Sequence, residues 1–204
     1  ENNYDIEFEN VSFSYLENAN NKVLKDLNFK IKTGSTFGII GSTGSGKSSI
    51  INLLPRLHDV TSGSIKINNV NVKDLSIDEL RKNIAVVLQE QILFSGDIKY
   101  NLRYGKSDAT EEEMIEACKQ ACAWEFVSQL PSKLNSTVEQ RGRNFSGGQK
   151  QRLCLARALI KKPKILILDD TTIALDLITE TKIQENIKKN LTNCTKIIIS
   201  ERVS

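Results

Sequence analysis

The segment from Gly41 to Ser48 has the residue types and spacing needed to hold a phosphate group. It reads G-x-x-x-x-G-K-S, the pattern of a phosphate-binding loop. Glycines let a backbone curve closely around an anion, and the N–H groups and dipole at the start of the next helix attract it. Lys47 can bridge the β- and γ-phosphates of a nucleoside triphosphate, and the Ser48 hydroxyl can bind Mg²⁺. The predicted nucleotide-binding residues of this loop are Gly41, Ser42, Thr43, Gly44, Ser45, Gly46, Lys47, Ser48 and Ser49.

Two consecutive carboxylates end an apolar run later in the chain. Residues Ile165–Leu168 are all apolar and predict a buried strand, which is followed by Asp169 and Asp170. A carboxylate at the end of such a strand can hold Mg²⁺, usually through water, in sites of phosphoryl transfer. We therefore predict Asp169 as a metal ligand.

A second candidate anion site begins at residue 146. Ser146, Gly147, Gly148 and Gln149 stand at the start of a helix predicted over Gly147–Ile160. The unpaired N–H groups at a helix start attract anions, so this segment also suits a phosphate.

The elements that position these segments alternate between strands and helices. Thr36–Ile40 is a short apolar run that leads directly into Gly41, and the loop opens a helix over Lys47–Leu54. Thr110 and Glu113 have the spacing of a capping box. Further strands are predicted at Asp5–Phe13, Leu27–Ile31, Ser64–Ile67, Ala85–Leu88 and Lys196–Ser200, and further helical structure at Thr110–Leu130 and Thr179–Asn190. This order predicts an α/β fold with a mostly parallel core sheet.

Composition limits the classes of protein to consider. The chain has 204 residues, enough for one domain with a sizeable core. Its net charge of +3 is too small to indicate a nucleic-acid partner or an anionic membrane surface. It contains no apolar run of about 18 residues, the length that a membrane-spanning helix needs. The four cysteines, Cys118, Cys122, Cys154 and Cys194, are expected to be reduced thiols.

The phosphate loop, the Ser-Gly-Gly-Gln segment and the strand ending in Asp169 together resemble the nucleotide-binding domain of an ATP-binding cassette (ABC) transporter. The resemblance covers essentially the whole chain. It implies a RecA-like P-loop NTPase core with an N-terminal antiparallel β portion and an α-helical subdomain. Residues 1–89 and 161–204 would form the core, and residues 90–160 the helical subdomain. Domains of this family normally continue past the final strand, so we expect further elements after Ser204.

The resemblance also assigns roles to single residues. Tyr15 would stack on adenine, and Gln89 would join the Mg²⁺ shell and contact the transmembrane domain. Ser146–Gln149, the signature segment, would bind ATP held by the loop of a second ABC domain, so the motif implies a head-to-tail dimer. Asp176 would belong to a loop that communicates between the two sites, and it suits a helix N-cap equally well. ATP and Mg²⁺ are the implied ligands, and the cytosolic face of a membrane the implied location.

Two positions differ from the family pattern. Asp170 stands where the family has a glutamate that polarises the attacking water, and its side chain is shorter by about 1.5 Å. Glu201 stands where the family has a histidine that donates towards the γ-phosphate, and a glutamate at neutral pH is negatively charged. His58, the only histidine, lies elsewhere in the sequence and is expected to be structural.

These differences resemble the degenerate half of heterodimeric exporters of drugs and lipids. The first hypothesis is an ATPase module of an exporter. The segment Val138–Gly142 supports it, because it resembles an exporter-type loop that contacts intracellular helices. The second is a regulatory ATP-binding half whose own site does not hydrolyse ATP, while its signature completes the site of a non-identical partner. A soluble cassette protein acting on DNA or ribosomes is disfavoured, because there is one cassette without a long coiled-coil insertion. Engineered substitution at Asp170 and Glu201 is the alternative that the sequence leaves open.

Overall fold

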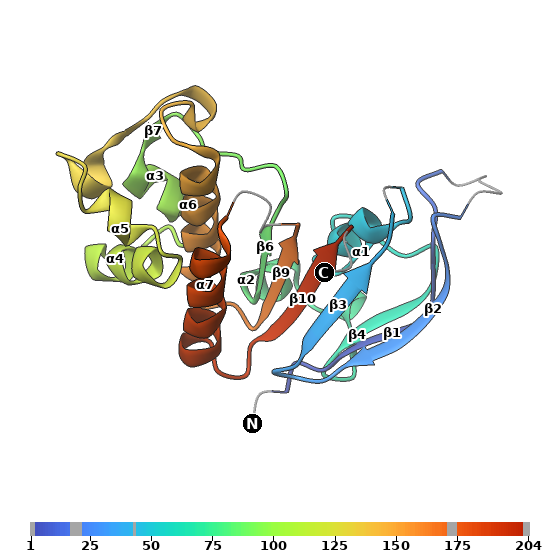
Figure 1. The fold of residues 1–204 in the computed structure, drawn as a ribbon. Coiled ribbons are helices and arrows are strands. Elements are labelled where there is room, and N and C mark those ends of the chain that lie inside the picture. The colour runs from blue at the N-terminus through green and yellow to red at the C-terminus, as the bar shows by residue number, and fades with distance from the viewer. Residues whose placement is uncertain (1–2, 17–21, 43, 171–174, 202–204) are drawn as a thin grey trace. The chain divides into compact units, whose positions relative to one another are not determined.

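A computed structural model describes residues 3–16, 22–42, 44–170 and 175–201 of the chain (Figure 1). The strands are β1 (Ile6–Phe13), β2 (Leu24–Ile31), β3 (Thr36–Ile40), β4 (Ser62–Ile67), β5 (Val70–Asn71), β6 (Ile84–Val87), β7 (Gly96–Asp97), β8 (Thr137–Val138), β9 (Ile165–Asp169) and β10 (Thr195–Ser200). The α-helices are α1 (Lys47–Leu53), α2 (Ile77–Lys82), α3 (Ile98–Arg103), α4 (Glu111–Gln120), α5 (Trp124–Val127), α6 (Gly147–Leu159) and α7 (Leu177–Asn190). Strands and helices alternate along much of the chain, as the sequence predicts.

An antiparallel sheet in the order β2-β1-β4-β5 forms the N-terminal β portion. Phe8 in β1 faces Phe29 in β2 and Ile65 in β4, and the two phenylalanine rings stack with centroids 4.4 Å apart. Cross-strand aromatic pairs of this kind stabilise a sheet and specify its register. The antiparallel portion expected from the sequence is therefore present.

A second sheet, in the order β3-β10-β9-β6, carries the strand that leads into the phosphate loop. β10 pairs with β3 in parallel, from Lys196 opposite Thr36 to Ser200 opposite Ile40. Ile165, Ile167 and Ile199 have almost no exposed surface and belong to one apolar core. A continuously apolar strand such as β9 suits a sheet that is covered on both faces.

The helical residues around α4 and α6 bury a separate set of side chains. Met114, Ala117 and Cys118 of α4 and Ala121 at its C-cap are all buried. The predicted capping box is confirmed, because the Glu113 N–H donates to Thr110 Oγ1 and the Thr110 N–H donates to the Glu113 carboxylate, each at 3.2 Å. Lys106 and Thr110 together lower the pKa of Glu113.

The chain divides into two compact units. The first contains residues 1–86, 164–167 and 193–204, and the second contains residues 87–163 and 168–192. In the described part of the chain, no helix is long and apolar enough to cross a bilayer.

The capping box at α4 gives a stability prediction. Replacing Thr110 by alanine removes the hydroxyl that satisfies the Glu113 N–H, so we expect the free energy of unfolding to fall by about 1 kcal/mol. Thr110→Ser keeps the hydroxyl and is expected to stay close to the wild type. Urea unfolding followed by circular dichroism measures both variants, and equal stabilities of the alanine and serine variants would contradict the role of the cap.

Candidate functional site

Glycine geometry shapes the predicted phosphate loop. Gly44 and Gly46 have φ angles of 81° and 94°, in the left-handed region where a side chain is strained. A Cβ on Gly46 would lie 2.8 Å from Leu24 Cδ2 and 3.0 Å from the Val23 carbonyl oxygen, so space as well as φ requires glycine there. Gly46 is also the N-cap of α1, which begins at Lys47. Thr43 lies outside the described residues.

Lys47 is turned back towards its own loop. Its ammonium donates a hydrogen bond to the Gly41 carbonyl, and its side chain is only 10% exposed. The same nitrogen lies 4.0 Å from Glu201 Oε1. Because β10 runs parallel to β3, Glu201 follows Ser200 at the same sheet edge where Gly41 follows Ile40. The structure therefore brings Gly41, Lys47 and Glu201 together.

Tyr15 lies beside α1, the helix that follows the phosphate loop. Its hydroxyl is 3.2 Å from the Ser49 hydroxyl, which is buried in α1, while 53% of Tyr15 is exposed. Its ring also contacts the rings of Phe13 and His58. The contact with His58 was not anticipated, because nothing in the sequence shows that two aromatic residues 43 positions apart meet.

The signature segment forms a tightly capped helix start. The Gln149 N–H donates to Ser146 Oγ at 3.2 Å, and the Ser146 N–H donates to Gln149 Oε1 at 3.0 Å. This capping box fixes the first turn of α6. Ser146 and Gly147 are exposed, so the positive end of the dipole of this 13-residue helix lies at the protein surface. The arrangement suits an anion that another molecule presents.

The remaining predicted residues belong to the second unit. Asp169 is the last residue of β9, and Asp170 follows with a φ of 44°, a conformation that aspartate tolerates better than most residues. Asp176 caps α7 by accepting hydrogen bonds from the N–H and the hydroxyl of Thr179, which lower its pKa. Gln89 is exposed two residues after β6. Residues 171–174, between Asp170 and Asp176, lie outside the described part of the chain.

The donor set predicted for Mg²⁺ has suitable chemistry. Ser48 offers a hydroxyl oxygen, Gln89 an amide oxygen and Asp169 a carboxylate oxygen. Mg²⁺ prefers oxygen ligands and usually takes only one or two carboxylates, with waters and substrate phosphates completing its shell. The oxygen types that these residues carry therefore suit the ion.

The cysteines have the properties of buried structural residues. All four are free and buried. Burial raises the pKa of the Cys118 thiol to about 12 and that of Cys194 to about 11, so neither is a reactive thiolate at neutral pH. Within the residues that the structure describes, no group of three or more His, Cys, Asp and Glu side chains is arranged to hold a metal ion.

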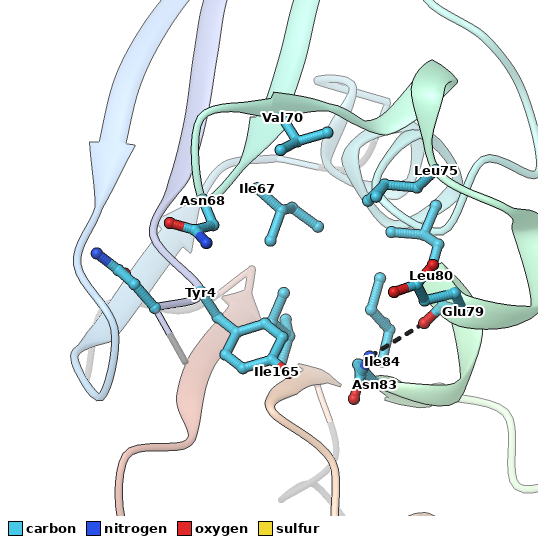
Figure 2. A pocket seen from close by; sticks show the side chains of 11 residues that line it. Tyr4, Ile67, Asn68, Val70, Leu75, Glu79, Leu80, Asn83, Ile84 and Ile165 are labelled. Atoms are coloured by element: carbon cyan, nitrogen blue, oxygen red, sulfur yellow. Dashed lines mark hydrogen bonds between the residues drawn. The ribbon is translucent and has the colours of Figure 1, made fainter. Parts of the chain in front are cut away.

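A pocket of about 190 Å³ lies where the strands β6 and β9 begin, at the opposite end of the sheet from the phosphate loop. Figure 2 shows Tyr4, Ile67, Leu80, Ile84 and Ile165 around it. Backbone hydrogen bonds from Ile165 to Asn83 and from Thr195 to Lys164 show that β6, β9 and β10 begin side by side. Gly41 instead follows the last residue of β3, so this mainly apolar pocket is separate from the phosphate loop.

Comparison with known proteins gives one consistent family. The family model described as "ABC transporter" matches residues 24–173. ABC transporter B family member 2 of Dictyostelium discoideum is 44% identical over 98% of the chain, and multidrug resistance protein pgp-1 of Caenorhabditis elegans is 46% identical over 98%. The chain spans 14% and 15% of the lengths of these two relatives.

A solved structure shares the fold. The structure of a bacterial Atm1-family ABC exporter with ATP bound matches 98% of the chain with a TM-score of 0.93 and 36% sequence identity, and the match covers 35% of that protein. Likeness in sequence and in fold therefore extends over nearly all of the chain. The chain belongs to the ABC transporter family, a family of ATPases, as a nucleotide-binding domain of the B-family exporter type.

Proposed function

We propose that this chain binds Mg-ATP and, as one of two ABC domains arranged head to tail, couples ATP binding and hydrolysis to export across a membrane. The observation that carries the proposal is the loop itself, in which left-handed glycines precede α1 and the Lys47 ammonium turns into the loop's curve. The bacterial Atm1-family ABC exporter that shares this fold was solved with ATP bound.

The partners follow from the family and from the exposed signature. We infer a second ABC domain, whose nucleotide the N–H groups at the start of α6 would contact, and a transmembrane domain contacted near Gln89. The location would be the cytosolic face of the membrane. We keep the assignment of residues 1–89 and 161–204 to the core and of residues 90–160 to the helical subdomain as part of this proposal.

Each residue of the nucleotide site would do one task. The loop N–H groups between Gly41 and Ser48 bind the phosphates, and Lys47 exchanges the Gly41 carbonyl for phosphate oxygens. Ser48, Gln89 and Asp169 would hold Mg²⁺, which neutralises charge on the phosphates. Tyr15 would provide an aromatic surface for the base.

Hydrolysis at the chain's own site would be slow. Asp170 reaches about 1.5 Å less far than a glutamate, and a general base has to come within about 2.6–3.2 Å of its proton. Glu201 would place a negative charge near the γ-phosphate, and its 4.0 Å contact with Lys47 supports this position at the loop. The alternative function is a regulatory half that binds ATP without hydrolysis while its signature completes the site of a non-identical partner.

The Lys47–Glu201 contact gives a binding prediction. Glu201→Gln removes a carboxylate that competes with phosphate for the Lys47 ammonium. Glu201 is 43% exposed, so solvent screens the pair, and pairs of this kind contribute about 0.2–1 kcal/mol. We therefore expect ATP to bind about 1.5- to 5-fold more tightly, with a smaller gain at high salt.

Calorimetric titration with Mg-ATP at two salt concentrations measures the effect. Glu9→Gln is the matched control, because Glu9 pairs with Lys66 at 3.0 Å on the surface of the same unit. Unchanged or weaker ATP binding by Glu201→Gln would show that the carboxylate does not oppose the phosphates.

The two departures from the family pattern give a turnover prediction. Asp170→Glu together with Glu201→His restores the longer base and the donor, so steady-state Mg-ATP turnover should rise by at least about tenfold, since a positioned base contributes about 10²–10⁴-fold. Each single variant should gain less than the pair.

Phosphate release at saturating Mg-ATP is the measurement. Adding Lys47→Ala to the double variant is the control, and it should abolish the gain because the nucleotide is no longer held. A double variant that binds ATP but turns over no faster than the wild type would refute a site weakened by these two residues.

A further inference from the structure

Three aromatic rings meet at the C-terminal end of β1 in the antiparallel sheet. Phe13, at the end of β1, is only 3% exposed, and its ring centroid lies 4.7 Å from that of Tyr15 at an interplanar angle of 76°. The His58 ring lies 5.4 Å from Tyr15 at 87° and 5.8 Å from Phe13. Edge-to-face contacts at these distances are attractive. Neither neighbour stacks flat on Tyr15, whose ring stays half exposed.

The hydroxyl end of Tyr15 is held as well. It shares a hydrogen bond with the Ser49 hydroxyl at 3.2 Å. Ser49 is 2% exposed in α1, two residues after Lys47. Tyr15 is thus restrained by contacts with two rings and by a hydrogen bond at its hydroxyl end.

The segment that carries His58 is itself firmly anchored. The N–H groups of Leu57 and His58 both donate to the Asn52 carbonyl, at 2.8 and 3.3 Å. The Arg56 guanidinium forms a salt bridge with Asp59 at 2.9 Å, which spans the turn that contains His58. The Arg81 guanidinium donates to the carbonyls of Pro55 and Arg56, each at 2.9 Å. His58 is therefore a ring on a well-supported turn, although the side chain itself is exposed.

We propose that His58 is a positioning residue of the nucleotide site, which holds Tyr15 in the orientation that receives the base. The inference rests on the proposed role of Tyr15 as the adenine-stacking residue. A half-exposed side chain loses rotamer freedom when a base stacks on it, and a side chain that is already held loses less. His58 and Phe13 restrain the ring through near-perpendicular ring contacts, and 53% of Tyr15 stays exposed for a flat partner. His58 thereby raises base affinity without touching the nucleotide.

The experiment compares a ligand that has a base with one that lacks it. His58→Ala should weaken binding of Mg-ATP by about 2- to 12-fold, the range expected for one side chain that has to be immobilised on binding. Binding of inorganic tripolyphosphate should be unchanged, because the phosphate loop is intact. His58→Phe keeps a flat ring and should bind Mg-ATP nearly as well as the wild type. Equal losses for ATP and tripolyphosphate, or a phenylalanine variant as weak as the alanine variant, would overturn the inference.

A double-mutant cycle with Tyr15→Ala separates this inference from the proposed role of Tyr15. Tyr15→Ala should weaken Mg-ATP but not tripolyphosphate, and adding His58→Ala to it should cost nothing more. A loss with Tyr15→Ala and none with His58→Ala would refute the inference about His58 alone. Unchanged Mg-ATP binding by Tyr15→Ala would refute the base-stacking role and the inference with it.

Discussion

The parallel pairing of β3 with β10 is the constraint on which the phosphate loop depends. It runs in register from Thr36 opposite Lys196 to Ile40 opposite Ser200, and the Gly41 N–H continues it by donating to the Ser200 carbonyl at 3.3 Å. The first residue of the loop and Glu201 therefore leave the sheet at the same edge. The buried isoleucines of β9 and β10 hold these strands in the core of the first unit. A loop that starts from a fixed strand end can present its N–H groups without first being ordered.

Because of this pairing, the proposed nucleotide site contains both phosphate-binding groups and a negatively charged side chain. The glycine geometry and Lys47 provide strong phosphate-binding chemistry, while Glu201 brings a negative charge to the same place. The start of α6 is capped by its own Ser146 and Gln149 side chains, and its first residues are exposed, which suits the proposed contact with an anion that another molecule presents. We interpret the chain as a domain that binds ATP well, hydrolyses it poorly in its own site and is equipped to complete the site of a partner.

Much of this arrangement could be predicted from the sequence, because the strongest patterns are local. β3 has the predicted bounds, and α6 and β9 each differ from prediction by one residue at the end. α7 begins at Leu177 rather than at the predicted Thr179, and Asp176 is its N-cap, a role that the sequence also suggested. The short helices α2 and α3 were missed, since six residues hold too little of a helical period to recognise. The contacts of Lys47 with Glu201 and of Tyr15 with His58 join residues far apart in the chain, and only the fold brings them together.

We propose that this chain's own site retains ATP without turning it over at an appreciable rate. The most direct test measures bound nucleotide and released phosphate in the same samples, across a wide range of protein concentration and at saturating Mg-ATP. We expect occupied sites with phosphate release near background at every concentration. Release that rises faster than linearly with protein concentration would mean that two copies of this chain form competent sites, and that Asp170 and Glu201 do not weaken them.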